Sequence, residues 1–400
     1  MSSPDPMLDS LLRATVDSGA SDLHLTVGRP ATARRDGVLI SFENVPVLEA
    51  EEIDRMVYSL LDQRKLDELN RDRQVDFSFG IDGVGRFRAN AFRQRGHLAL
   101  ALRVVPFRVR SLEELGAPAA CTTLLNKPYG IVLVVGPTGS GKSTTLAAMV
   151  DRINDTKPVH ILTIEDPVEY LHHHKTAMVN QREVGTDVES FPDGLRSALR
   201  EDPDVVLLGE MRDLDSIQIA LSLAETGHLV FATLHTNDAA QALDRIIDVF
   251  PSERRDQIQI MLAGALQGVI SQRLVPALNG GRVAGYEVMV ANEAIRNLVR
   301  ECKSRQMRNM ISTGAGEGMQ TIEMDLARLV AAGLISLEVA MASSAYPKEV
   351  QAQLATARAQ MHGHATASTG QSGSSGSGTY AGEAPASEPM APPVPVGNGS

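Results

Sequence analysis

The fold is decided by one stretch, Gly136-Pro137-Thr138-Gly139-Ser140-Gly141-Lys142-Ser143-Thr144. The apolar run 131–135 precedes it, and after it apolar residues recur at helical spacing from 146 to 153. A strand, a glycine-rich loop and a helix, in this order, are the context in which such a pattern forms a phosphate-binding P-loop. Glycines let backbone N–H groups curl around a polyphosphate, and a helix N-terminus favours negative charge. The stretch therefore predicts that residues 136–144 bind a nucleoside triphosphate.

Two side chains of this loop have expected roles of their own. Lys142 would reach the β- and γ-phosphates, and the Ser143 hydroxyl would ligate Mg²⁺. The alternative is a glycine-rich turn that contains a lysine by chance, and the flanking strand and helix patterns disfavour it. ATP and Mg²⁺ are the predicted cofactors.

Length and composition narrow the class of protein. A chain of 400 residues is too long for one ordinary core, so we expect two or more domains. The net charge of −11 and an aromatic content of only 4% disfavour a nucleic-acid motor, which would need basic patches or stacking platforms. No stretch approaches the roughly 18 apolar residues of a membrane span, and the first residues do not read as a signal peptide. We expect a cytoplasmic protein without direct membrane insertion, in which Cys121 and Cys302 are reduced thiols.

The first quarter of the chain mixes helical and strand patterns. Its expected elements are a helix at 7–18, a strand at 21–27, a helical stretch at 48–69, and alternating strands at 86–93 and 98–105 that a turn at 94–96 joins. These patterns predict an α+β domain over residues 1–105. Residues 106–118 would be a linker.

The remainder alternates apolar strands with helices. The expected core strands are 131–135, 160–164, 205–208 and 229–234, and the region 253–341 is expected to be helical. Nearly continuous apolar strands indicate a mainly parallel sheet with helices on both faces, so residues 119–345 are predicted to form an α/β domain. Residues 346–400 are rich in Ala, Ser, Gly and Pro, and we expect a disordered tail.

Two acids follow predicted core strands, at the edge where ligands of open α/β sheets bind. Glu165 follows the strand 160–164 and is the candidate base for the attacking water. Glu210 comes one residue after Gly209, where an ordinary Walker B strand would end in aspartate, and we expect it to serve the Mg²⁺ shell with Ser143. Asp204 precedes the same strand and would lie at its wrong end. The alternative for Glu165 and Glu210 is that each acid caps a turn.

Histidines flank the last core strand. His235 follows residues 229–234 and would lie beside the P-loop, where it can hydrogen-bond to the γ-phosphate. His228 precedes the same strand. The alternative for each histidine is an ordinary structural residue. The three histidines at 172–174 lie in a loop pattern and cannot readily share one ion on one face of a strand, so no metal site is predicted there.

Arginines appear at two further places. In the alternating strands, Arg86, Arg88 and Arg103 lie on a polar face, which is either a solvated surface or a source of arginine fingers at a domain or subunit interface. In the helical stretch 294–301, Arg296 and Arg300 are spaced i,i+4. That helix is either an ordinary surface helix or a contact that relays nucleotide state to another subunit or partner.

Several motifs together resemble a known family. They are the P-loop, the acid box Ile161–Tyr170, Gly209–Asp213, Glu225–Thr236, Ala20–Leu25, Val179–Glu183, Gly194–Asp204 and Ala294–Glu301. In this order they are similar to the secretion ATPases of type II secretion and type IV pilus systems, and among these to the pilus retraction ATPases. The resemblance covers residues 7–345.

The resemblance implies an architecture and partners. Each subunit would have an N-terminal PAS-like domain and a C-terminal RecA-like domain with ATP bound between them, and six subunits would form a ring. The homohexamer would act at the inner face of the cytoplasmic membrane on an inner-membrane platform protein, alone or together with a second pilus ATPase. It would hydrolyse ATP to power pilus retraction and twitching motility.

The resemblance also implies residue roles. By motif match, Glu165 is the acid-box glutamate and Glu210 is the Walker B glutamate. The two His-box residues are His228 and His235, and the arginines that approach the phosphates are Arg88 and Arg103. The stretch 92–97 is shorter than the family's hairpin, which leaves the choice of arginines open.

Three rival functions remain. The same fold could power pilus assembly or type II secretion, although the four-cysteine zinc module common in those ATPases is absent. The chain could also be a nucleotide-gated accessory subunit of the pilus platform with little turnover. A DNA translocase is the third, and the acidic net charge disfavours it.

Overall fold

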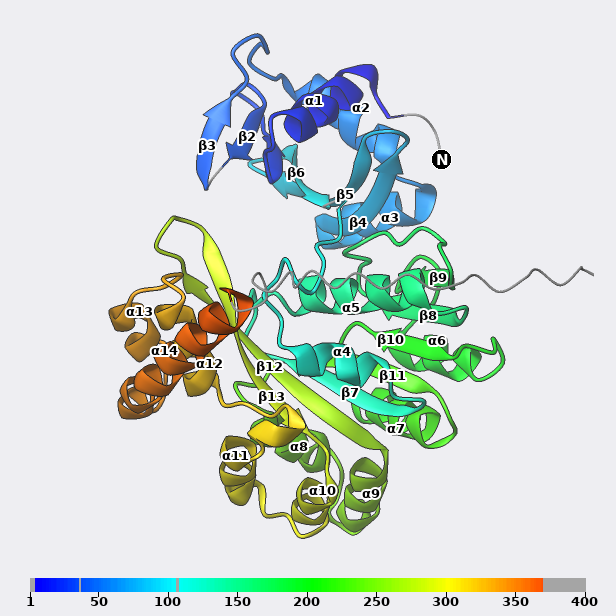
Figure 1. Ribbon diagram of the computed structural model, residues 1–400. Coiled ribbons are helices and arrows are strands. Elements are labelled where there is room, and N and C mark those ends of the chain that lie inside the picture. Colours follow the sequence, from blue (N-terminus) through cyan, green and yellow to red (C-terminus); the bar gives the residue numbers. More distant parts are fainter. Residues whose placement is uncertain (1–3, 36, 106–107, 370–400) are drawn as a thin grey trace, which may run out of the picture.

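The computed structural model describes residues 4–35, 37–105 and 108–369, which contain two β-sheets with helices packed around them (Figure 1). The first sheet has six antiparallel strands in the order β3-β2-β1-β6-β5-β4. Its strands and the helices α1–α3 are β1 (Asp22–Leu25), β2 (Thr32–Arg35), β3 (Val38–Ser41), β4 (Gln74–Ile81), β5 (Gly85–Gln94), β6 (His97–Val105), α1 (Pro6–Asp17), α2 (Ala50–Leu60) and α3 (Gln63–Asp72).

The β5–β6 hairpin agrees with the predicted alternation. Phe87 and Ala91 are buried in the core of this sheet, whereas Arg86 and Arg88 on the alternate positions remain partly exposed. Arg95 and Gly96 both have positive φ angles, 49° and 87°, as a two-residue hairpin turn of the primed type requires. The polar face of β5 therefore lies outside the N-terminal core.

The predicted helical stretch 48–69 is two helices rather than one. Asp62 interrupts it, and its carboxylate accepts a hydrogen bond from the Lys65 backbone N–H at the start of α3. Strands β2, β3 and β4 were not predicted, because two of them are only four residues long and Thr32–Arg35 carries two arginines.

The second sheet has seven strands in the order β13-β12-β7-β11-β10-β8-β9, parallel except for β13. These strands are β7 (Gly130–Val135), β8 (His160–Glu165), β9 (Met178–Glu183), β10 (Val205–Leu208), β11 (Leu229–Leu234), β12 (Leu266–Pro276) and β13 (Arg282–Val290). Every residue of β7, β10 and β11 is buried, as expected for strands covered on both faces. The predicted fold class, an α+β unit followed by a mainly parallel α/β sheet, is confirmed.

Helices surround this sheet on both faces (Figure 1). They are α4 (Ala119–Leu125), α5 (Lys142–Thr156), α6 (Phe191–Ala198), α7 (Leu214–Glu225), α8 (Ala239–Asp248), α9 (Ser252–Ala265), α10 (Glu293–Arg300), α11 (Ser304–Thr313), α12 (Ile322–Ala331), α13 (Leu337–Ala342) and α14 (Pro347–Thr369). Among the described residues, none of the helices combines the length and the apolar character needed to cross a bilayer.

The expectation of an all-helical region over 253–341 was wrong. A long antiparallel hairpin, β12–β13, occupies residues 266–290 and extends the parallel sheet beyond β7. Its turn, Asn279-Gly280-Gly281, has positive φ at both glycines, 84° and 72°. Asn-Gly between apolar runs is a strong hairpin signal, and it could have predicted this element.

The expected start of a disordered tail at residue 346 was too early. Helix α14 begins at Pro347, and its Val350 packs fully buried against the core next to α12. Arg308 fixes the start of α14 because it forms ion pairs with Glu323 and Glu349 and lies 3.9 Å from the Tyr346 ring centroid. Residues 370–400 of the predicted tail, and residues 106–107 of the predicted linker, lie outside the described residues.

Candidate nucleotide-binding and hydrolysis site

The P-loop connects β7 to α5 in a conformation that needs glycine at two points. Gly136 and Gly141 have φ angles of +151° and +89°, and a Cβ atom on Gly136 would lie 2.3 Å from the Gln272 carbonyl oxygen. At Gly141 it would lie 2.8 Å from Gln272 Nε2. No side chain caps the N-terminus of α5, so its first N–H groups can bind an anion.

A cavity of about 720 Å³ opens over this loop at the carboxyl edge of the sheet. Its volume falls within the range of small-ligand sites in proteins. Its lining includes the P-loop residues Thr138, Gly139, Gly141, Lys142, Ser143 and Thr144, the strand-end residues Glu165, Glu210 and His235, and the arginines Arg88 and Arg103. Both β-sheets therefore contribute to one cavity.

The Lys142 ammonium lies inside the P-loop. Its Nζ donates to the carbonyl oxygens of Gly136 at 2.8 Å and Pro137 at 3.1 Å, and it lies 3.4 Å from His235 Nδ1. Burial lowers the pKa of Lys142, while the charge of Glu210 opposes that shift. The phosphates of a nucleotide would replace the carbonyl oxygens as partners of this cation.

Glu210 and His235 face each other across the cavity floor. His235 Nε2 lies 3.3 Å from Glu210 Oε2, and Arg212 Nη2 donates to the same oxygen at 2.7 Å. Burial favours the protonated form of Glu210, but the Arg212 hydrogen bond and the His235 charge outweigh it and hold the pKa below its ordinary value. The carboxylate is thus ionised at neutral pH and able to serve a cation.

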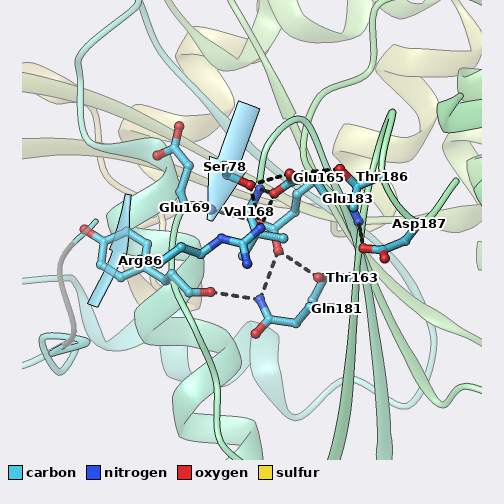
Figure 2. Close-up of polar contacts among 11 residues, drawn as sticks. Ser78, Arg86, Thr163, Glu165, Val168, Glu169, Gln181, Glu183, Thr186 and Asp187 are labelled. Atoms are coloured by element: carbon cyan, nitrogen blue, oxygen red, sulfur yellow. Dashed lines mark hydrogen bonds and ion pairs between the residues drawn. The ribbon is translucent and has the colours of Figure 1, made fainter. Parts of the chain in front are cut away.

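Glu165 occupies a different electrostatic setting at the end of β8. Its carboxylate accepts hydrogen bonds from Thr163 Oγ1 at 2.7 Å, Gln181 Nε2 at 3.2 Å and the Glu169 N–H at 3.4 Å, contacts that Figure 2 places at the strand ends. Burial raises the pKa of Glu165 above its ordinary value. A carboxylate with a raised pKa accepts a proton more readily, which suits a general base.

The two arginines of the N-terminal sheet are cross-strand neighbours. Arg88 on β5 pairs in register with Arg103 on β6, so both side chains lie on the same face of the sheet. Arg88 Nη1 contacts Glu169 Oε1 at 3.1 Å, and Arg103 Nε donates to Asp22 Oδ1 at 2.9 Å. This cross-strand pair brings positive charge to the roof of the cavity.

The structure does not bring His228 to this cavity. His228 precedes β11, at the opposite end of the strand from His235, and seven residue steps at about 3.3 Å each separate the two histidines by roughly 23 Å. Its Nδ1 lies 3.0 Å from the Leu223 carbonyl oxygen, at the C-terminal end of α7. Within this chain the histidine is therefore a loop contact rather than a neighbour of the P-loop.

Sequence reasoning missed several polar residues of the site. Tyr170 reaches Thr144 of the P-loop at 2.9 Å, and Gln272 of the unpredicted hairpin accepts from Thr145 at 2.7 Å. Gln181, on the unpredicted strand β9, bonds to Glu165. His172 lines the cavity, and no cluster of three metal-ligating side chains occurs in the described part of the chain.

Arg296 turns inward rather than toward solvent. Its guanidinium donates to the carbonyl oxygens of Ala263 at 2.5 Å and Gly264 at 2.8 Å, the last residues of α9. Arg300 is exposed and bonds within its own helix to Asn297. The two arginines of the stretch 294–301 thus differ in their surroundings.

Comparison with known proteins gives consistent matches along most of the chain. Residues 5–350 match the family described as type II/IV secretion system protein. A Pseudomonas aeruginosa protein named type IV pilus retraction ATPase PilT is 49% identical over 341 residues, or 85% of this chain and 99% of that protein. A Neisseria gonorrhoeae twitching motility protein is 50% identical over 74% of this chain and 80% of its own length.

A solved structure extends the likeness to the fold. The crystal structure of a pilus retraction motor, PilT, with bound ADP superposes with a TM-score of 0.80. It shares 49% sequence identity, and the match covers 86% of this chain and 98% of that one.

Proposed function

Because this chain belongs to the type II/IV secretion system protein family, we propose that it is an ATP-hydrolysing motor that powers retraction of type IV pili. The relatives that carry the names pilus retraction ATPase and twitching motility protein match most of its length. The observation that supports the proposal most directly is the cavity in which the P-loop, Glu165 and Glu210 meet Arg88 and Arg103 from the other sheet. In a motor, ATP hydrolysis must depend on the position of a second structural unit. This cavity meets that requirement because residues of both β-sheets line it.

The proposed chemistry assigns each side chain a step. Lys142 and the first N–H groups of α5 would bind the phosphates. Glu165 would take a proton from a water molecule while the water oxygen attacks the γ-phosphorus. The bond between that phosphorus and the β–γ bridging oxygen breaks, and ADP and inorganic phosphate result. Arg88 and Arg103 would stabilise the negative charge that develops on the transferred group.

Magnesium fits the oxygen donors that line the cavity. The Ser143 hydroxyl and the ionised Glu210 carboxylate both face it, and hydroxyl, carboxylate and phosphate oxygens are the ligands that Mg²⁺ prefers. When bound, the ion would neutralise phosphate charge. His235, 3.3 Å from Glu210, would report whether a γ-phosphate is present.

The working assembly is proposed to be a ring of six subunits. Each subunit would consist of residues 1–105 and 119–345, joined by 106–118, and the ring would act on an inner-membrane platform protein from the cytoplasmic side. Cycles of ATP hydrolysis would change the angle between the two units and thereby turn the platform.

The test is a comparison of three strains: wild type, a deletion of this gene, and a strain with Lys142→Ala. Retraction predicts an excess of static pili in both altered strains and no twitching motility. Bald cells would identify an assembly motor instead and overturn the proposal. Purified Lys142→Ala protein should lose ATP turnover, whereas Lys157→Ala, at the far end of α5, should retain it.

A further inference from the structure

The two β-sheets are joined by a buried ion pair outside the candidate catalytic residues. Arg86 on β5 contacts Glu183 at the end of β9, with Nη2 2.5 Å from Oε2. Ser78 on β4 donates to the other oxygen of the same carboxylate and accepts from Arg86 Nη2 at 2.7 Å. Figure 2 shows Ser78 and Arg86 converging on Glu183 from the N-terminal sheet. The residues Ser78, Arg86 and Glu183 form the interface triad.

The triad continues into the acid box. Glu183 Oε2 also accepts a hydrogen bond from the Val168 backbone N–H, at 3.0 Å. The next backbone N–H along, that of Glu169, donates to Glu165 Oε2 at 3.4 Å. The Glu183 carboxylate therefore bonds both to the N-terminal sheet and to the Val168 N–H. The neighbouring N–H, that of Glu169, contacts the proposed base Glu165.

Strand β9 supports Glu165 a second time. Glu183 pairs in register with Glu165 across β8 and β9, and Gln181, two residues earlier, donates to Glu165 Oε1 at 3.2 Å. Gln181 also donates to the Tyr170 carbonyl oxygen at 2.8 Å. The same strand thus contacts the acid box at Glu165, in its middle, and at Tyr170, its last residue.

Glu183 depends on the N-terminal sheet for its charge balance. It is only 4% exposed, and Ser78 is 6% exposed. Burial opposes ionisation of Glu183, yet the Ser78 hydrogen bond and the Arg86 charge lower its pKa overall. A buried carboxylate that lost both partners would keep Val168 as its principal donor and would have to move toward water or take up a proton.

We propose that Glu183 is a positioning residue that couples the N-terminal sheet to Glu165. While Ser78 and Arg86 bind the Glu183 carboxylate, that carboxylate holds the Val168 N–H in place. Glu165 then keeps the position needed for hydrolysis. When the sheet moves away, the acid box loses this support and hydrolysis slows. The inference rests on the proposed role of Glu165 as the base. In the proposed ring, this coupling would restrict ATP hydrolysis to subunits whose two sheets are in contact.

Arg88 lies on the same face of β5, two residues from Arg86, and contacts Glu169. When the two sheets dock through the triad, the same movement would therefore bring Arg88 to the phosphates and fix the position of the acid box. Arg86 itself is not among the residues that line the nucleotide cavity, which separates its role from that of Arg88.

The test measures ATP turnover and ADP affinity of purified full-length Glu183→Gln, Arg86→Ala and Arg86→Lys. Displacement of a reacting group by about 1 Å costs up to 100-fold in rate, so kcat should fall about 10- to 100-fold in Glu183→Gln and Arg86→Ala. The KM for ATP and the Kd for ADP should stay within about 3-fold, because the P-loop is untouched. Arg86→Lys keeps the charge and should recover part of kcat.

Arg64→Ala is the matched control. Arg64 crosses between the same two units by donating from α3 to the Gly185 carbonyl oxygen, but within the described part of the chain it forms no hydrogen bond or ion pair with the acid box. Its removal should leave kcat within about 2-fold of wild type. An equal fall in kcat in Arg64→Ala would mean that docking in general, rather than Glu183, controls turnover, and would overturn the inference.

Two further results separate this inference from the proposed function. If Glu165→Gln abolishes turnover while Glu183→Gln and Arg86→Ala keep wild-type kcat, the base is right and the coupling is wrong. If ADP affinity and the unfolding temperature fall together with kcat in Glu183→Gln and Arg86→Ala, and Arg86→Lys recovers none of the loss seen in Arg86→Ala, the triad is merely structural, which also overturns the inference.

Discussion

Glu165 and Glu210 are two carboxylates of one cavity with opposite shifts of pKa. Burial raises the pKa of Glu165, whereas Arg212 and His235 more than offset burial and lower that of Glu210. Such a division favours a proton acceptor at one position and a cation ligand at the other. The sequence predicted both residues from their place after core strands, but the electrostatic difference depends on neighbours that only the fold supplies.

Glu165→Gln tests the assignment of the base. The single amide oxygen can still accept a hydrogen bond from Thr163, but the amide cannot take a proton, so kcat should fall by roughly 10² or more while ADP still binds. Steady-state hydrolysis and ADP binding by the purified protein check this. Asp204→Asn is the control, because Asp204 lies at the opposite end of β10 and bonds to the His160 N–H. Unchanged turnover in Glu165→Gln would remove Glu165 from this role.

Site residues could be predicted where they belong to a local sequence motif. They could not be predicted where the site depends on contacts between distant segments. Lys142 and Ser143 follow from nine consecutive residues. Glu183 meets Ser78 across 105 sequence positions, and nothing in either segment alone indicates the contact. His228 shows the limit of motif matching, because a residue within a motif can lie at the far end of a strand from the P-loop of the same chain.

At the scale of elements, α10 packs on α9 through apolar side chains such as Ile295 and Leu262, and one arginine adds hydrogen bonds to this contact. Arg296 donates to the carbonyl oxygens of Ala263 and Gly264, which lie in the last turn of α9, where carbonyl groups lack an i+4 partner within the helix. Arg300 makes only an exposed bond to Asn297. The stretch 294–301 therefore combines an inward, structural arginine with an outward one that is available to a partner.

Arg296→Ala should lower the free energy of unfolding by about 1–2 kcal/mol, since it removes two charged hydrogen bonds from a half-buried helix end. Arg300→Ala should change it by no more than about 0.5 kcal/mol. Urea unfolding of both purified variants, followed by circular dichroism, measures the difference. Equal stability of the two variants would show that the contact with α9 contributes nothing.

Three strands of the second sheet that sequence patterns missed share a physical cause. Strand β9 carries polar and charged residues because it is an edge strand that faces the other unit. Strands β12 and β13 carry Gln272, Arg273 and Glu287 among mainly apolar residues. Each of these polar groups is satisfied by a partner elsewhere in the fold rather than by solvent. Periodicity alone detects strands whose two faces differ, and it fails where buried polar pairs blur that difference.

For the molecule as a whole, the placement of one sheet against the other was not predictable from composition or periodicity. It is determined by contacts such as Arg86 with Glu183 and Arg88 with Glu169, each of which spans more than 80 residues. The family resemblance supplied an expectation of a nucleotide between two units, and the structure supplies the contacts by which such an arrangement can act on Glu165.

Stability of the whole molecule should depend on the protonation of Glu287. This carboxyl group lies on β13, is 5% exposed and accepts from the Ala239 N–H at the start of α8. Burial raises its pKa to about 7, with the Ala239 bond opposing the shift; among the charged groups around it, Asp238 and Glu323 add to the rise and Arg308 opposes it. The sheet hairpin and the helix that follows His235 meet at this group.

The sign of the pH dependence follows from the two pKa values. Between about pH 4.5 and 7 the folded protein keeps a proton on Glu287 that the unfolded chain releases, so stability contributed by this group falls as pH rises through that window and is constant above it. Glu287→Gln cannot titrate but still accepts from Ala239. Its free energy of unfolding should match wild type near pH 4.5 and exceed it by up to about 3 kcal/mol at pH 8. Urea midpoints at pH 4.5, 6 and 8 measure this, and a constant difference across the series would mean that Glu287 ionises as freely in the folded protein as in the unfolded chain.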